Sequence, residues 1–198
     1  MKDCLEGMFR VLSSRNVLIR FLSLWAVGFT VMYVAWSISY RSLPEGVLCG
    51  KLLVSQVEIV TQELLSTFSR ILGYNLIFAC FPLVIANLVR VKRLPLGYLL
   101  VPYHWAMYGT LLGTNSFAFP SPSRLLPAFE TLFRGVGICE ITAYTLLAAA
   151  TYGVTVYFSR GRFDLRIVGL ERAERIGLAV SMALLAVSNF VEAWQIVR

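Results

Sequence analysis

The sequence predicts an all-α membrane protein, a polytopic bundle of five transmembrane helices with amphipathic helices at the interface. Three observations favour this class. Of the 198 residues, 58% are hydrophobic and only 15% are charged, whereas a soluble domain carries about 25% charged residues. The mean hydropathy is +0.71. Five long apolar stretches are separated by polar ones, and none alternates as the strands of a membrane barrel do.

Each apolar stretch is long enough to cross a membrane, because a hydrocarbon core about 30 Å thick needs about 20 apolar residues in a helix. The first stretch has a long polar lead-in, so we expect a retained anchor rather than a signal peptide. We expect a single membrane domain over residues 1–198. The expected spans are residues 21–40, 71–89, 94–119, 135–158 and 176–197.

The positive charges of the loops orient these spans. With the N-terminus in the cytoplasm, twelve of the 18 basic residues fall on the inner side and six on the outer side. This bias predicts a plasma-membrane protein with a cytoplasmic N-terminus and an external C-terminus. The inner residues are Lys2, Arg10, Arg15, Arg20, Arg90, Lys92, Arg93, Arg160, Arg162, Arg166, Arg172 and Arg175; the outer ones are Arg41, Lys51, Arg70, Arg124, Arg134 and Arg198.

Two further segments are amphipathic. Residues 51–69 place apolar side chains at helical spacing and predict a helix on the outer surface or over the outer end of the bundle. Residues 5–19 mix apolar residues with Arg10 and Arg15, which favours a helix on the inner surface. Simple packing of both segments against the bundle is the alternative. The apolar positions of the outer segment are Leu53, Val57, Val60, Leu64 and Phe68.

The sequence carries no motif for catalysis, metal binding or a cofactor. A single histidine excludes the two-histidine zinc motif, and the four cysteines have no CxxC spacing. Neither a GxSxG elbow nor a phosphate-binding GxxxxGK loop occurs. We therefore expect a protein that is not an enzyme, with no cofactor and no nucleic-acid partner. A pair of carboxylates alone can support acid–base chemistry, so an intramembrane enzyme stays an alternative.

Several polar side chains fall inside the predicted spans. Glu140 and Glu192 both lie about 8–9 Å inside the outer boundary, at 1.5 Å per residue. Asn75 and Asn115 also fall in outer halves, and His104 lies near mid-depth. An ionisable group at this depth faces protein or water. The layer is therefore a candidate site with three interpretations: hydrogen-bonded structural contacts, a wet cavity used for transport, or a site for an ion or lipid headgroup.

Small residues indicate where helices approach closely. Gly109 and Gly113 form a GxxxG pair, and Gly135 and Gly137 precede Glu140. At such positions backbones can touch, so we expect these faces to pack against another helix, within the chain or in a homo-oligomer.

Four groups of residues resemble a known family. From about residue 71 onward, the chain resembles the stage II sporulation protein M family of bacterial and archaeal membrane proteins. The family's Pro-His before the first glutamate is replaced by Gly135-Val136, and its Asn-Gly in the third span is absent as such. Only Gly137, Glu140 and Glu192 match the family residue for residue. The groups that carry the resemblance are Tyr74-Asn75-Leu76, His104-Trp105 with Gly109, Gly137 with Cys139-Glu140-Ile141, and Asn189-Phe190-Val191-Glu192-Ala193.

The resemblance implies a five-span plasma-membrane protein. In spore-forming bacteria the family resembles a scaffold that holds cell-wall hydrolases at the septal membrane. Our first hypothesis is accordingly a non-enzymatic scaffold or subunit of a membrane complex, in contact with the bilayer and with other membrane or envelope proteins. The alternative is a transport component, a permease paired with a cytoplasmic ATPase, that uses the outer-half carboxylates.

Overall fold

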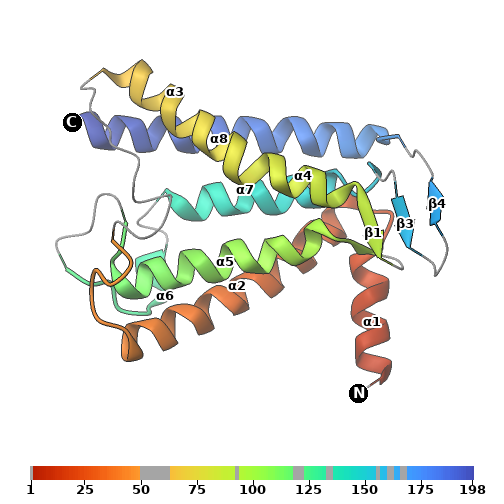
Figure 1. Cartoon of the computed structure of the whole chain (residues 1–198), viewed down its shortest axis with the longest axis horizontal. Helices are drawn as coiled ribbons and strands as arrows, with labels where there is room; N and C mark the ends of the chain where they lie inside the picture. Colours follow the sequence, from red (N-terminus) through yellow and green to blue (C-terminus); the bar gives the residue numbers. More distant parts are fainter. Residues whose placement is uncertain are drawn as a thin grey trace.

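In the computed structural model the chain is mostly helical, and its long helices lie side by side (Figure 1). Three of them are long and apolar enough to cross a membrane. They are α2 (Val17–Ser42), the continuous helix Leu64–Asn87, and α8 (Arg172–Val197). The described residues are 2–49, 63–91, 94–117, 123–132, 136–154, 157–159, 163–165 and 169–198.

The N-terminal segment is two helices rather than one. Helix α1 (Lys2–Leu12) ends before the Asn16 side chain, which caps α2 by accepting hydrogen bonds from the backbone N–H groups of Leu18 and Ile19. Asparagine is among the strongest N-cap residues because its side-chain oxygen satisfies these free donors. The single helix predicted over residues 5–19 is therefore wrong, since Ile19 belongs to α2. Helix α1 runs crosswise to the bundle at one end (Figure 1).

The second long helix has three parts and starts earlier than predicted. They are α3 (Leu64–Asn75), the π-helical turn η2 (Leu76–Cys80) and α4 (Phe81–Asn87). Pro82 lies at the start of α4, directly after the π-helical turn. The separate outer helix expected over residues 51–69 is wrong for residues 64–69, because Leu64 and Phe68 belong to α3; residues 51–62 lie outside the described part.

Two central helices are shorter than the predicted spans 94–119 and 135–158. Helix α5 (Gly97–Thr114) has 18 residues and α7 (Gly137–Ala150) has 14, which at 1.5 Å per residue gives about 27 and 21 Å. Helix α5 ends because Asn115 adopts the left-handed conformation, and α7 ends in a turn. Five spans of full length are thus not observed, although α5 and α7 run among the three long helices (Figure 1).

The all-α prediction misses a small sheet at the end of the bundle where α1 lies (Figure 1). Its strand order is β2-β1-β3-β4; β1 and β3 are parallel, and each hairpin pair is antiparallel. The strands fall where helix ends or a loop were expected, since a short apolar run does not distinguish a strand from a helix end. They are β1 (Val89–Val91), β2 (Leu94–Pro95), β3 (Tyr157–Ser159) and β4 (Phe163–Leu165).

Helices α2 and α5 make the most extensive helix contact among the described elements. A Cβ on Gly109 would strike the backbone oxygen of Met32, and one on Gly113 would strike Ser39 and lie 2.7 Å from the Trp36 oxygen. Gly28 on α2 in turn makes room for the ring of Trp105. The structure therefore places the GxxxG pair against another helix of the same chain. The short helix α6 (Phe129–Leu132) lies at the far end of the bundle from the sheet (Figure 1).

Candidate functional site

The two carboxyl groups predicted at equal depth meet in the structure. Glu140 lies in the first turn of α7, and Glu192 lies near the end of α8. Their side chains are joined by a hydrogen bond. The contact forms because α7 and α8 pack side by side in opposite directions (Figure 1), so that the start of one helix faces the end of the other. The dipole of α7 also favours a carboxyl group in the first turn of that helix, where Glu140 lies.

Two amides complete this cluster. The Nδ2 atom of Asn75 donates to Glu140 Oε1 at 3.0 Å and to Asn189 Oδ1 at 3.0 Å. Asn189 is fully buried. It lies three residues before Glu192 on α8, and that spacing places both side chains on one helix face. The four residues form the carboxyl–amide cluster: Asn75, Glu140, Asn189 and Glu192.

Asn75 lies directly before the π-helical turn. Asn75 is the last residue of α3, and η2 begins at the next residue. A π turn inserts one extra residue into a helix and is often found at functional sites. Cys80, the last residue of η2, is buried, and its thiol is close enough to Glu140 for the two groups to interact electrostatically. The irregular turn therefore borders the cluster directly.

The other predicted site residues lie elsewhere. The Nδ1 atom of His104 contacts the backbone oxygen of Leu100 at 2.7 Å, and its ring lies beside Tyr144. Asn115 caps α5 and donates to Glu45 Oε1 at 2.7 Å, in the loop after α2. Gly137 packs against the ring of Tyr108. Gly135, together with Arg134, lies outside the described residues.

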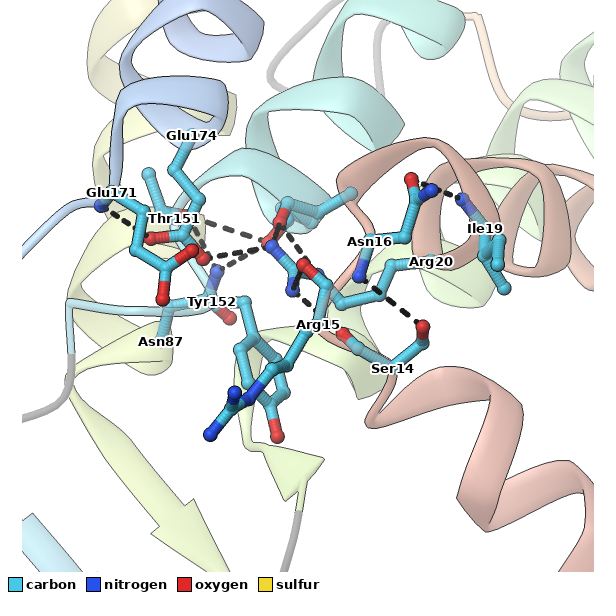
Figure 2. A network of polar contacts seen from close by, with 12 residues as sticks. Ser14, Arg15, Asn16, Ile19, Arg20, Asn87, Thr151, Tyr152, Glu171 and Glu174 are labelled. Atoms are coloured by element: carbon cyan, nitrogen blue, oxygen red, sulfur yellow. Dashed lines mark hydrogen bonds and ion pairs between the residues drawn. The ribbon is translucent and has the colours of Figure 1, made fainter.

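A second buried polar group lies at the opposite end of the bundle (Figure 2). Arg20 on α2 and Glu174 on α8 form an ion pair at 2.7 Å between Nη2 and Oε1, and their side chains are only 1% and 6% exposed. Arg20 also donates to the Ala149 oxygen at 3.0 and 3.1 Å, and to the oxygens of Ser14 and Arg15. The five N–H groups of a guanidinium are all used in this arrangement.

Neighbouring residues hold this ion pair in place. Glu174 accepts a hydrogen bond from the backbone N–H of Glu171 at 3.1 Å, within the capping box that starts α8. The ring of Tyr152 lies under both Arg20, at 4.5 Å, and Arg90, at 4.1 Å. Asn87 donates to the Ala148 oxygen and to Thr151 Oγ1. These contacts join α2, α4, α8 and the end of α7, so the group links four helices of the bundle (Figure 2).

Arg20 was expected on the inner side, just before the span of residues 21–40, whereas it lies inside α2, and its ion pair was not predicted. One signal was available: residues 17–19 are Val-Leu-Ile and directly precede Arg20, with Asn16 as a good N-cap. That pattern starts the helix before Arg20 and carries the arginine into it. No local pattern pairs it with Glu174, because 153 residues separate the two along the chain.

Comparisons with protein-family models, with curated proteins and with solved structures return no match. The chemistry of the site therefore rests on its geometry alone. Among the described residues, no three His, Cys, Asp or Glu side chains come together as a metal site.

Proposed function

We propose that the chain is a five-pass membrane protein that acts as a scaffold or subunit of a membrane complex, with a cytoplasmic N-terminus and an external C-terminus. Five helical segments run in alternating directions along one axis (Figure 1): α2, Leu64–Asn87, α5, α7 and α8. The N-terminus, the sheet and the start of α8 share one end. Among the described residues, basic residues assigned to the inner side lie in or between the elements at that end, which supports the orientation; they are Arg10, Arg15, Arg20, Arg90, Arg172 and Arg175.

The observation that carries the scaffold proposal is the packing between the two buried polar groups. Leu83 lies between Asn75 and Asn87 on one helix, and Leu185 lies between Glu174 and Asn189 on another. Both leucines are fully buried. Leu147 and Val101, each 1% exposed, lie in the same core cluster. These apolar side chains lie between the two polar groups, together with the buried and hydrogen-bonded Thr145 and Ser181. Such packing supports a rigid platform.

Two surfaces are available for partners. At the sheet end, exposed arginines of α1 and α8 offer positive charge to an acidic protein surface; they are Arg10, Arg172 and Arg175. Along Leu64–Asn87, large apolar side chains are exposed, among them Ile77, Phe78 and Phe81. Within a membrane such a face contacts lipid or the helices of a partner. The resemblance to the stage II sporulation protein M family, which we propose as the family of this chain, adds the expectation of an envelope partner.

The test is purification of the tagged full chain from its native membrane in a mild detergent. The scaffold proposal expects a stable complex with a partner that has a domain outside the membrane. Replacing Phe78 and Phe81 by alanine should weaken that complex if the partner binds through the membrane face. The matched control is Leu99→Ala, an exposed apolar residue on α5. A chain that purifies alone contradicts the proposal.

A transport component is the second candidate function. The observation that favours it is the carboxyl–amide cluster beside the π-helical turn, because buried carboxyls next to an irregular helix are typical of transport pathways. This proposal expects a cytoplasmic ATPase in the purified complex instead. It also expects that Glu140→Gln abolishes transport in a protein that stays folded. An intact complex without any ATPase contradicts it.

A further inference from the structure

Helix α1 differs from the other helices in its direction. It runs crosswise to the long helices at the end of the bundle where the sheet lies, and its first residue points away from them (Figure 1). Its last residue, Leu12, is 7% exposed and belongs to the core cluster. The end of α1 is therefore anchored in the bundle, and the helix extends sideways from that anchor.

The exposed residues of α1 divide into an apolar side and a polar side. Phe9 lies three residues before Leu12, and this spacing places both side chains on one side of the helix. The bundle covers Leu12, whereas Phe9 and the neighbouring Val11 are each 41% exposed. Glu6 and Arg10, four residues apart on the other side of the helix, are both exposed. The apolar side of α1 thus continues beyond the area that the bundle covers.

The connection between α1 and α2 fixes this sideways direction (Figure 2). Arg20 Nη1 donates to the backbone oxygen of Ser14 at 2.7 Å and to that of Arg15 at 3.2 Å. The backbone N–H of Asn16 donates to Ser14 Oγ at 3.2 Å. Arg20 is itself held by the buried Glu174. Because a buried ion pair holds the connection, the direction of α1 is part of the packed structure.

This direction fits the surface of a membrane. The long helices of the bundle can cross a membrane, so a helix crosswise to them at their ends runs parallel to the membrane surface. An isolated helix of fewer than about 12–15 residues is only marginally stable in water, and α1 has 11 residues. Helices with one apolar and one polar side lie in the headgroup region, with the apolar side inserted about 5–10 Å.

We propose that α1 lies on the membrane surface at the sheet end of the bundle, with Phe9 and Val11 inserted among the lipids and Arg10 in water. A lipid surface fits better than a second protein, because the apolar side that carries Phe9 is the side that Leu12 turns toward the bundle. The inference rests on the proposed crossing of the membrane by the bundle. It depends neither on the direction of crossing nor on the scaffold function.

The test is photocrosslinking of the full chain in nanodiscs that contain phosphatidylcholine and phosphatidylglycerol in equal parts. Phe9→benzoylphenylalanine places a photoreactive ring on the apolar side, and Arg10→benzoylphenylalanine places the same ring on the polar side. After illumination, mass spectrometry identifies what is attached to each position. We expect several-fold more lipid adduct at position 9 than at position 10. Equal lipid adducts at both positions, or crosslinks from position 9 to protein in place of lipid, overturn the proposal.

A third position separates this inference from the membrane crossing itself. Leu99 on α5 is 68% exposed, so Leu99→benzoylphenylalanine should also form a lipid adduct if the bundle crosses the membrane. An adduct at position 99 without one at position 9 leaves the crossing intact and shows that α1 does not lie on the surface. The absence of lipid adducts at both positions contradicts the crossing, and this inference with it.

Hydrogen exchange provides a second measurement without a photoreactive side chain. In nanodiscs, the backbone amides of residues 2–12 should exchange several-fold more slowly in the unmodified chain than in Phe9→Ser, because the serine removes the inserted ring. Phe9→Leu keeps an apolar side chain and should retain the slow exchange. Equal exchange rates in the unmodified chain and in Phe9→Ser would show that insertion of this side chain does not hold α1 in place, and would overturn the proposal.

Discussion

At the scale of single residues, Arg20 shows how a buried charge becomes tolerable. Its guanidinium meets one carboxylate and three backbone oxygens, so no N–H group is left without an acceptor. Two of these oxygens, those of Ser14 and Arg15, belong to the connection between α1 and α2. The Ala149 oxygen lies near the end of α7, where helix carbonyls lack partners within the helix. The Arg20 side chain therefore holds together the α1–α2 connection, the end of α7 and the start of α8.

We predict that Arg20→Leu destabilises the protein by about 3–5 kcal/mol, because it leaves Glu174 charged and buried without a partner. Arg20→Lys should recover only part of this loss, since an ammonium cannot make the two-pronged contact to Ala149. The measurement is thermal unfolding in detergent. Arg15→Ala is the control: its side chain is exposed, and its backbone oxygen is unchanged. Equal Tm values for Arg20→Leu and Arg15→Ala would contradict the prediction.

Substitutions of Glu140 provide a second residue-scale prediction. Glu140→Gln should keep the fold, because the new side chain still accepts from Asn75 and still donates toward Glu192. Glu140→Leu removes the acceptor of the Asn75 amide and should cost about 1–3 kcal/mol. Tm and the elution volume in size-exclusion chromatography distinguish the two. If Leu is tolerated as well as Gln, the hydrogen bonds of the cluster do not contribute to stability.

At the scale of elements, glycines set the distance between α2 and α5. These helices touch through the backbone at Gly109 and Gly113, so the contact depends on the absence of a Cβ rather than on a large side chain. The aromatic Trp105 fills the adjacent space beside Gly28 and donates to Thr145 Oγ1 at 2.8 Å. Small and large residues thus interlock along one helix pair.

We predict that Gly109→Leu lowers the Tm strongly and that Gly109→Ala already lowers it, because a single methyl group would meet the Met32 backbone oxygen. Gly73→Ala on α3 is the matched control, since a Cβ there would meet nothing within 4 Å. That change should leave the Tm unchanged or raise it slightly, as alanine favours a helix by about 1 kcal/mol over glycine. Unchanged stability and oligomer size in Gly109→Leu would show that this face does not pack.

At the scale of the whole molecule, the helices and their connections predict an orientation that can be measured directly. Reporter fusions after Arg93 and Arg162 should read cytoplasmic, and fusions after Lys51 and Ser123 should read external. The physical reason is the excess of basic residues on the predicted inner side. A reversed result at two of the four sites would contradict the orientation, and a cytoplasmic result at Ser123 alone would remove α5 or α7 from the set of crossing helices.

The sequence by itself determined the class of the molecule and much of the cluster. Long apolar runs identified the three helices able to cross a membrane, because hydropathy over about 20 residues is a local property. Glu140 and Glu192 were placed at equal depth by counting residues at a constant rise. Asn75 was placed in the same outer layer by the same count.

Only the tertiary structure decided the rest. The pairing of Arg20 with Glu174, the pairing of β1 with β3 and the ends of α5 and α7 each depend on residues far away in the chain. His104 and Asn115 were expected in the same polar layer as Glu140, but their side chains contact the Leu100 oxygen and Glu45 instead. Depth along a helix does not specify the direction in which a side chain points. Contacts between distant segments form only when the helices pack, and no local pattern records them.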